Sequence, residues 1–271
     1  MIAADRYFLR GVFALVIIGP FAISAQEKCP AGDLPAYSHN DYQNARPLTD
    51  ALALGYRGAE ADIFLVDGVF RVGHDRASAQ TGGSFEALYL APLRALVKKC
   101  GALRADNQPF LLTVEVKESS LASFDSLSAL LSRYADISNA THQSSPIEVV
   151  LVGWSPSPDE LSRRHFELAS LQYLIGKSSG SRTTLEPDRI RLVSLDYGKT
   201  AGRWWSSAKS RKTWLDRALS VKREKPDRLL RIFNVPVDAK IYTELLASGA
   251  DLIGTKTLAR SRWALIEARR E

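Results

Sequence analysis

Apolar strand-like segments alternate with helix-like segments along almost the whole chain. The strand-like segments are 34–39, 58–66, 109–117, 147–154, 171–175, 190–195, 229–235 and 251–254. The segment 147–154 is apolar almost throughout, which is typical of a strand that is covered on both faces. About eight such strand–helix units over roughly 230 residues predict a (β/α)8 TIM barrel. We expect this barrel to form a single domain over residues 33–271.

The first 25 residues have a different character. Arg6 and Arg10 precede an apolar run over residues 12–23, and small residues follow at Ser24 and Ala25. The run is short for a bilayer span, and its layout is typical of a secretory signal. We therefore expect residues 1–25 to be a signal peptide and the mature protein to be exported, either to the periplasm or out of the cell. A retained membrane anchor is the alternative, because Asp5 weakens the basic end.

The chain has two cysteines, Cys29 and Cys100. Export would make them candidates for one disulfide. Cys29 lies just before the first strand, and Cys100 ends a helix-like segment, so both would fall on the N-terminal face of a parallel barrel. Two unrelated thiols are the alternative.

Three carboxylates occupy strand-like segments. Glu60 and Asp62 lie two residues apart and therefore point to the same face of their strand. The other face is apolar and suited to packing on helices, so the two carboxylates should point into the barrel, where unpaired charge is costly. Glu115 has the same setting in the next strand. Three converging carboxylates predict one hard divalent cation, Mg²⁺ or Ca²⁺.

Two histidines flank these carboxylates in the sequence. His39 ends the first strand, and His74 follows a hairpin that turns at Asp67-Gly68. With a two-residue turn, His74 would lie level with the carboxylates along the hairpin. Its side chain would, however, point to the face that Glu60 and Asp62 do not use. We therefore expect a bulge or bend at Gly73 that turns the imidazole inward. Imidazoles beside a metal site are suited to general acid and base catalysis.

Several short motifs in this region resemble those of a known superfamily. They are His39-Asn40, Glu60-x-Asp62, Asp67-Gly68, His74-Asp75 and Glu115-x-Lys117. They resemble motifs of the glycerophosphodiester phosphodiesterase and phosphatidylinositol-specific phospholipase C superfamily, whose fold is a TIM barrel. The wording HNDY, RPL, VGHD and LYLAPL is most similar to the branch named after altered inheritance of mitochondria protein 6. The likeness is dense over residues 38–93 and thins after Glu115.

The resemblance implies a metal-dependent phosphodiesterase, a hydrolase active in lipid metabolism. Glu60, Asp62 and Glu115 would hold the cation, and His39 and His74 would act as general acid and base. The implied substrate contacts are Asn40 and Lys117. The implied substrate is a glycerophosphodiester-like or phosphoinositide-like phosphodiester, either a small molecule or a phospholipid head group.

Two other functions compete with this hypothesis. One is a non-catalytic exported barrel that binds a phosphorylated ligand. The other is a glycosidase, which would explain paired carboxylates but neither histidine. The net charge of +6 is spread along the chain, so no nucleic-acid partner is expected. It weakly favours anionic substrates and a transient contact with a membrane surface, and we expect a monomer.

Overall fold

A computed structural model describes residues 29–30, 32–118, 120–138, 145–153, 156–163, 168–175, 187–200, 203–204 and 208–270. The predicted signal peptide, residues 1–25, lies outside the described residues. Within the described ranges, no helix has both the length and the apolar character needed to cross a membrane.

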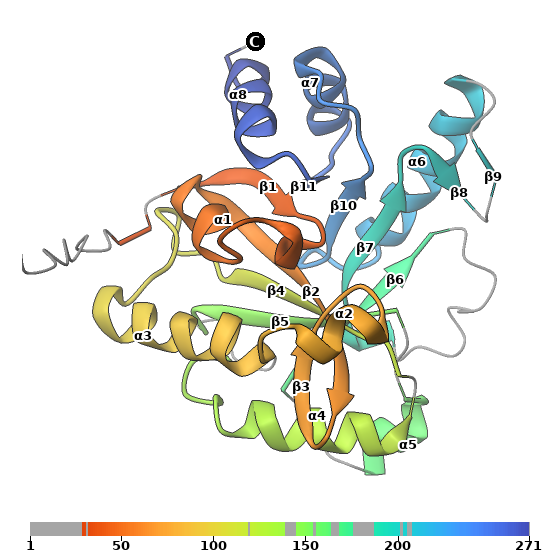
Figure 1. The fold of residues 1–271 in the computed structure, drawn as a ribbon. Coiled ribbons are helices and arrows are strands. Elements are labelled where there is room, and N and C mark those ends of the chain that lie inside the picture. The colour runs from red at the N-terminus through yellow and green to blue at the C-terminus, as the bar shows by residue number, and fades with distance from the viewer. Residues whose placement is uncertain are drawn as a thin grey trace, which may run out of the picture.

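Eight parallel strands form a closed barrel (Figure 1). They are β1 (Leu34–Ser38), β2 (Tyr56–Val66), β4 (Phe110–Val116), β5 (Ile147–Val152), β6 (Ser170–Leu174), β7 (Ile190–Asp196), β10 (Leu229–Phe233) and β11 (Leu252–Thr255). Each strand pairs in parallel with the next, and β11 closes the ring by pairing with β1. The TIM barrel predicted from the strand–helix alternation is therefore confirmed.

Helices surround the barrel and cover its outer wall (Figure 1). They are α1 (Thr49–Ala53), α2 (Arg76–Thr81), α3 (Ala91–Cys100), α4 (Leu121–Ser132), α5 (Pro158–Arg163), α6 (Ala208–Arg223), α7 (Ala239–Ala247) and α8 (Leu258–Ala268). Shorter elements are the 3-10 helices η1 (Asp41–Gln43) and η4 (Pro187–Arg189), the π-helix η2 (Glu86–Leu90) and the small hairpin of β8 (Lys199–Thr200) and β9 (Arg203–Trp204). Two large apolar clusters fill the space between strands and helices.

A separate apolar cluster fills the inside of the barrel. Its members are Tyr37, Leu111, Val150, Leu192, Leu229 and Leu252, one from each of six strands. Interior residues further along the strands are polar, namely Glu60, Thr113, Ser194 and Arg231, and all four are buried. The cluster therefore fills the interior towards the N-terminal ends of the strands. The polar residues lie towards the C-terminal ends, where TIM barrels place their sites.

Two local features bear on the predicted site. Cys29 and Cys100 are joined by a disulfide that ties the segment before β1 to the end of α3. The short strand β3 (Val69–Val72) runs antiparallel to β2, with Val66 opposite Val69 as a two-residue turn requires. The chain then bends at Gly73, where a side chain would lie 2.5 Å from the backbone nitrogen of Ala79.

Candidate active site

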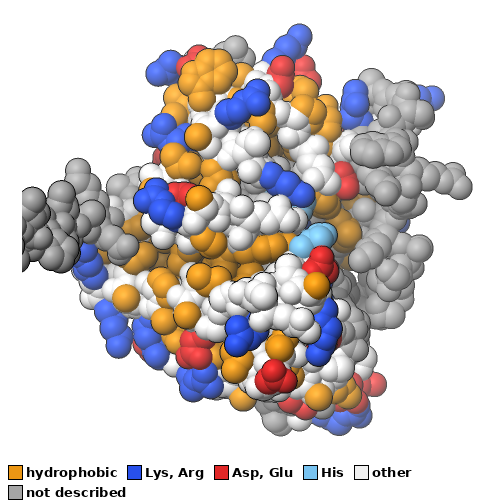
Figure 2. Space-filling view, in the orientation of Figure 1, with side chains coloured by type: hydrophobic (Ala, Val, Ile, Leu, Met, Phe, Trp, Pro, Cys, Tyr) orange, Lys and Arg blue, Asp and Glu red, His pale blue; other side chains and the backbone are white. Residues whose placement is uncertain are grey.

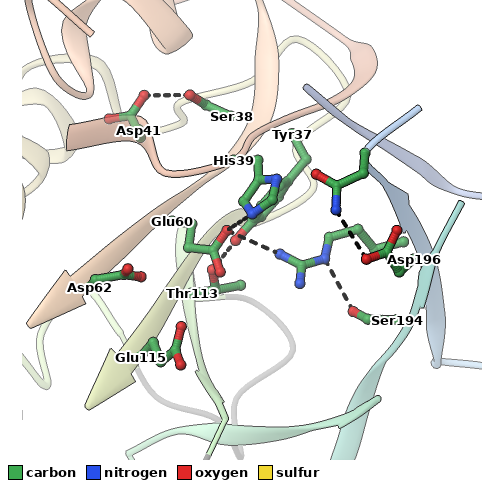
Figure 3. A network of polar contacts seen from close by, with 12 residues as sticks. Tyr37, Ser38, His39, Asp41, Glu60, Asp62, Thr113, Glu115, Ser194 and Asp196 are labelled. Atoms are coloured by element: carbon green, nitrogen blue, oxygen red, sulfur yellow. Dashed lines mark hydrogen bonds and ion pairs between the residues drawn. The ribbon is translucent and has the colours of Figure 1, made fainter. Parts of the chain in front are cut away.

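The three carboxylates lie together at the C-terminal ends of two neighbouring strands. Glu60 and Asp62 come from β2 and Glu115 from β4, and Asp62 is directly opposite Glu115 in the strand register. One oxygen of each carboxylate lies within 4.8 Å of the others. Figure 3 shows the three side chains side by side along the two strands. The structure thus brings together the three residues that the sequence predicts as metal ligands.

This cluster fits a hard cation chemically. One oxygen of Glu60 (Oε2) and one of Asp62 (Oδ1) are buried without a hydrogen-bond partner. Burial is the main cause that raises the pKa of Glu60, and the neighbouring carboxylates of Asp62 and Glu115 raise it further. Buried anionic oxygens without partners are costly, and a divalent cation bound through oxygen would satisfy them.

Lys117 lies directly against two of these carboxylates. Its Nζ is 2.9 Å from Asp62 Oδ2 and 2.9 Å from Glu115 Oε2. Burial lowers the pKa of Lys117, but the hydrogen bonds to Glu115 and Asp62 outweigh it and raise the pKa overall. The ammonium group therefore remains charged and partly neutralises the cluster. The sequence predicts a substrate contact for this side chain, and the geometry adds a second role as an internal cation.

His39 is the buried histidine of the pair. Its Nε2 lies 3.7 Å from Glu60 Oε2, and its side chain is 14% exposed. The ring packs edge-on against Phe233 at 5.3 Å between centroids. Burial first, and then the positive charge of Arg231, lowers the pKa of His39 to about 3. The imidazole is therefore neutral near pH 7.

His74 lies at the other end of the carboxylate pair. Its Nδ1 is 3.5 Å from Asp62 Oδ2, so the bend at Gly73 brings the ring to the carboxylates as the register argument requires. The side chain is 63% exposed. Figure 2 shows histidine on this face of the molecule, and His39 and His74 are the two histidines among the described residues.

The loop that follows His39 is held by a buried carboxylate. Asp41 is fully buried and accepts hydrogen bonds from Ser38 Oγ at 2.6 Å and from the Leu48 N–H at 2.6 Å. Asn40 has a left-handed backbone with φ of 52°, and its backbone N–H lies near enough to the Glu60 carboxylate to lower the pKa of that group. Asn40 thus contacts the site through its backbone, while the phosphate contact predicted for its side chain stays a prediction.

Comparison with known proteins finds a family to which this region is similar. Residues 30–110 match the family model of the AIM6-like phosphodiesterase domain. This part of the chain therefore resembles the AIM6-like phosphodiesterases. Altered inheritance of mitochondria protein 6 from Eremothecium gossypii is 27% identical over 149 residues, which cover 46% of this chain. The match spans only 38% of that relative's own length, so nothing about the whole relative transfers directly.

Solved structures of two proteins share the fold. A protein assigned as a glycerophosphoryl diester phosphodiesterase from Silicibacter pomeroyi DSS-3 superposes with a TM-score of 0.50, at 14% identity, over 88% of this chain and 95% of the other. A tryptophan synthase complex from Pyrococcus furiosus superposes with a TM-score of 0.53, at 13% identity, over 89% and 96%. Likeness at this level of identity shows the TIM-barrel fold alone.

The AIM6-like range covers only part of the site. Both histidines, Glu60 and Asp62 lie inside residues 30–110, whereas Glu115 and Lys117 lie beyond them. The second half of the barrel also contributes a residue that motif reading missed, Arg231 on β10.

Arg231 is a buried arginine on the floor of the site. It is 3% exposed, and its Nη1 lies 3.6 Å from Glu60 Oε2. Its Nε donates to Ser194 Oγ at 3.1 Å, and the guanidinium lies over the Tyr37 ring at 4.6 Å. The signal was in the sequence, because a charged residue at an alternate position of the apolar run 229–235 must face the barrel interior.

Tyr42 is the second residue that motif reading missed. Its hydroxyl donates to Asp62 Oδ2 at 2.7 Å and lies 3.1 Å from His74 Nδ1. No periodicity could have found this contact, because it depends on the path of the loop after β1.

Proposed function

We propose that this protein is a metal-dependent phosphodiesterase. The observation that carries the proposal is the three-carboxylate cluster, in which Glu60 and Asp62 are buried and each has one oxygen without a hydrogen bond, with an imidazole at each end. A cation bound by Glu60, Asp62 and Glu115 would supply Lewis-acid polarisation of a phosphate oxygen. The AIM6-like match over residues 30–110 supports the same chemistry.

The chain's own side chains supply the proton transfers and part of the charge. One imidazole takes the proton of the attacking hydroxyl, and the other gives a proton to the oxygen that leaves phosphorus, so His39 and His74 divide the two roles. Lys117 and Arg231 place positive charge beside the carboxylates, where it also attracts a phosphate anion. The Asn40 side chain is a further candidate for the phosphate contact.

The substrate class follows from the family resemblance. We propose a glycerophosphodiester-like or phosphoinositide-like substrate, as a soluble molecule or as a phospholipid head group met at a membrane surface.

We also propose that residues 1–25 are removed on export and that the mature protein is a monomer. The N-terminal sequence of the mature protein tests the first of these statements, because a start at or next to Ala25 is expected and an intact Met1 contradicts it.

Hydrolysis of bis(p-nitrophenyl) phosphate tests the activity directly. We expect turnover with Mg²⁺ or Ca²⁺, loss of turnover with EDTA, and recovery when the ion is restored. Turnover that EDTA leaves intact would contradict metal dependence. Absence of turnover with every ion, together with metal-dependent binding of glycerol phosphate in calorimetry, would instead support the non-catalytic binding protein.

The His39→Ala variant separates binding from chemistry. We expect it to keep metal affinity, because His39 Nε2 is 3.7 Å from Glu60 and makes no hydrogen bond to it. Its kcat should fall by about 10²–10⁴, the usual value of one positioned proton donor or acceptor. Normal turnover by pure His39→Ala protein would place the chemistry elsewhere.

A further inference from the structure

The Tyr42 hydroxyl connects a predicted metal ligand to a predicted proton-transfer residue. It is 2.7 Å from Asp62 Oδ2 and 3.1 Å from His74 Nδ1. Tyr42 belongs to η1, the single 3-10 turn that directly follows His39-Asn40. The phenol thus bridges the carboxylate end of the site and one imidazole.

The direction of the two hydrogen bonds follows from the number of protons available. A phenol has one proton to donate, and an ionised carboxylate can only accept. The shorter contact is the one to Asp62, at 2.7 Å, so the phenol gives its proton to that carboxylate. With its proton given to Asp62, the phenol oxygen offers a lone pair to His74. Nδ1 of His74 must then carry the hydrogen.

This bond is the main restraint on the His74 ring. The side chain is 63% exposed, and its distance of 3.5 Å to Asp62 Oδ2 is too long for a good hydrogen bond. His39 differs, because burial and the Phe233 ring hold it. The Tyr42 loop itself is rigidly placed, since the adjacent Asp41 accepts hydrogen bonds from Ser38, Leu48 and Tyr89.

We propose that Tyr42 is a positioning residue that fixes His74 in the Nδ1–H tautomer and makes Nε2 the nitrogen that exchanges a proton with the substrate. Which ring nitrogen is free is set by the hydrogen bond that the other nitrogen makes. When Nε2 acts as base, the O–H bond of the attacking hydroxyl breaks, its proton joins Nε2, and its electron pair forms the new O–P bond. The bond from phosphorus to the leaving oxygen breaks, and that oxygen departs with the electron pair. The reaction step rests on the proposed phosphodiesterase function, whereas the tautomer does not.

Nitrogen NMR of the full chain reads the tautomer directly. Long-range ¹H–¹⁵N correlation spectra are recorded at alkaline pH with EDTA present. We expect a protonated Nδ1 and a bare Nε2 in the wild type. In Tyr42→Phe we expect the ring to change to the Nε2–H form that free imidazole side chains prefer.

The matched control is Tyr134→Phe. Tyr134 also donates its hydroxyl proton to a carboxylate, Glu86, but far from the site, so its removal should leave the His74 signals unchanged. A wild-type His74 in the Nε2–H form would overturn the inference. So would a Tyr42→Phe protein whose His74 signals match the wild type.

Kinetics with bis(p-nitrophenyl) phosphate distinguish positioning from general support of the structure. Loss of an outer partner of this kind typically costs about 10–100-fold. We expect Tyr42→Phe to lose this factor in kcat while KM and the calorimetric metal affinity stay within about threefold. Equal losses in metal affinity and kcat would mean that Tyr42 serves the carboxylates and not His74. If no variant hydrolyses the substrate, the proposed function fails, and the NMR result still decides the tautomer.

Discussion

Buried acidic side chains have different partners at the two ends of the barrel. At the N-terminal end each buried or half-buried carboxylate has a basic partner: Arg191 Nε donates to both oxygens of Glu148 at 3.0 and 2.9 Å. Lys222 lies 2.6 Å from Asp251 at the same end. At the C-terminal end, Glu60 Oε2 and Asp62 Oδ1 are buried without a hydrogen-bond partner among the described residues, and Arg231 Nη1 lies 3.6 Å from Glu60 Oε2.

This difference indicates which acidic side chains stabilise the fold and which serve the candidate site. Ion pairs at the N-terminal end are complete within the chain, so they hold the fold together without a ligand. The C-terminal cluster is incomplete within the chain, because these two oxygens lack hydrogen bonds although the three carboxylates converge within 4.8 Å. Buried carboxylate oxygens without hydrogen bonds in a folded protein indicate a candidate binding site. Substitutions at the two ends should therefore have opposite effects.

The largest expected effect is on activity, in Glu60→Gln. The amide keeps the shape of the side chain but loses the anionic oxygen, so metal affinity should collapse. We expect kcat/KM to fall by on the order of 10³-fold or more, since the bound cation is worth several kcal/mol in the transition state. Calorimetry and steady-state kinetics check this, and unchanged metal affinity would contradict it.

The next effect is on stability, at the opposite end of the barrel, in Glu148→Gln. The Arg191 guanidinium would be left largely buried without its anion, because the side chains of this pair are 16% and 12% exposed. We expect the free energy of unfolding to drop by about 3 kcal/mol, as for other broken buried pairs. Urea unfolding measures this, and hydrolysis should stay within about twofold of wild type. A fall in hydrolysis well beyond twofold without the expected drop in the free energy of unfolding would contradict this difference between the two ends.

A smaller effect is expected on metal affinity, through the Lys117 ammonium group. Lys117 Nζ lies 2.9 Å from Asp62 and Glu115, so an incoming divalent ion must displace it. Lys117→Met should therefore bind Mg²⁺ or Mn²⁺ about tenfold more tightly, which corresponds to roughly 1.4 kcal/mol. Lys256→Met is the control, because Lys256 acts on the site through its charge and lowers the pKa of His39. Equal gains in the two variants would show that charge alone, not contact, is at work.

The smallest effect is the pH dependence of stability in the metal-free protein. Burial raises the pKa of Glu60 above its unfolded value, so the folded state binds the proton more tightly than the unfolded state. The ionised side chain therefore costs stability at neutral pH, and this cost disappears as pH falls through the folded pKa towards the unfolded value. Glu60→Gln should be more stable than wild type at pH 7 in EDTA and lose that advantage by about pH 4. A Gln variant less stable at pH 7 would contradict the sign.

The sequence predicts the barrel well because its signals are local and repeated. Alternation within 58–66 places Glu60 and Asp62 on one face, and the same reasoning applied to 229–235 would have found Arg231. The contacts of Lys117 and Tyr42 could not be predicted in this way. A lysine side chain can reach a carboxylate or a substrate from the same strand position, and the place of Tyr42 depends on the left-handed backbone of Asn40.

The path of the chain between β1 and β2 shows the same limit. Pro47 near a first turn and Gly55 at the end predict a helix over residues 47–54, but α1 covers only Thr49–Ala53. Leu48 has a φ of 61°, and its N–H is held by the buried Asp41 carboxylate. A long-range polar contact therefore sets where this helix begins, and propensity does not record such contacts.

Anomalous diffraction from crystals soaked with Mn²⁺ tests the central claim most directly. We expect one peak within about 2.0–2.6 Å of oxygens from Glu60, Asp62 and Glu115, with Lys117 moved away from Asp62. A cluster with no peak, and with Lys117 still between Asp62 and Glu115 at saturating Mn²⁺, would contradict the assignment of these carboxylates as a metal site.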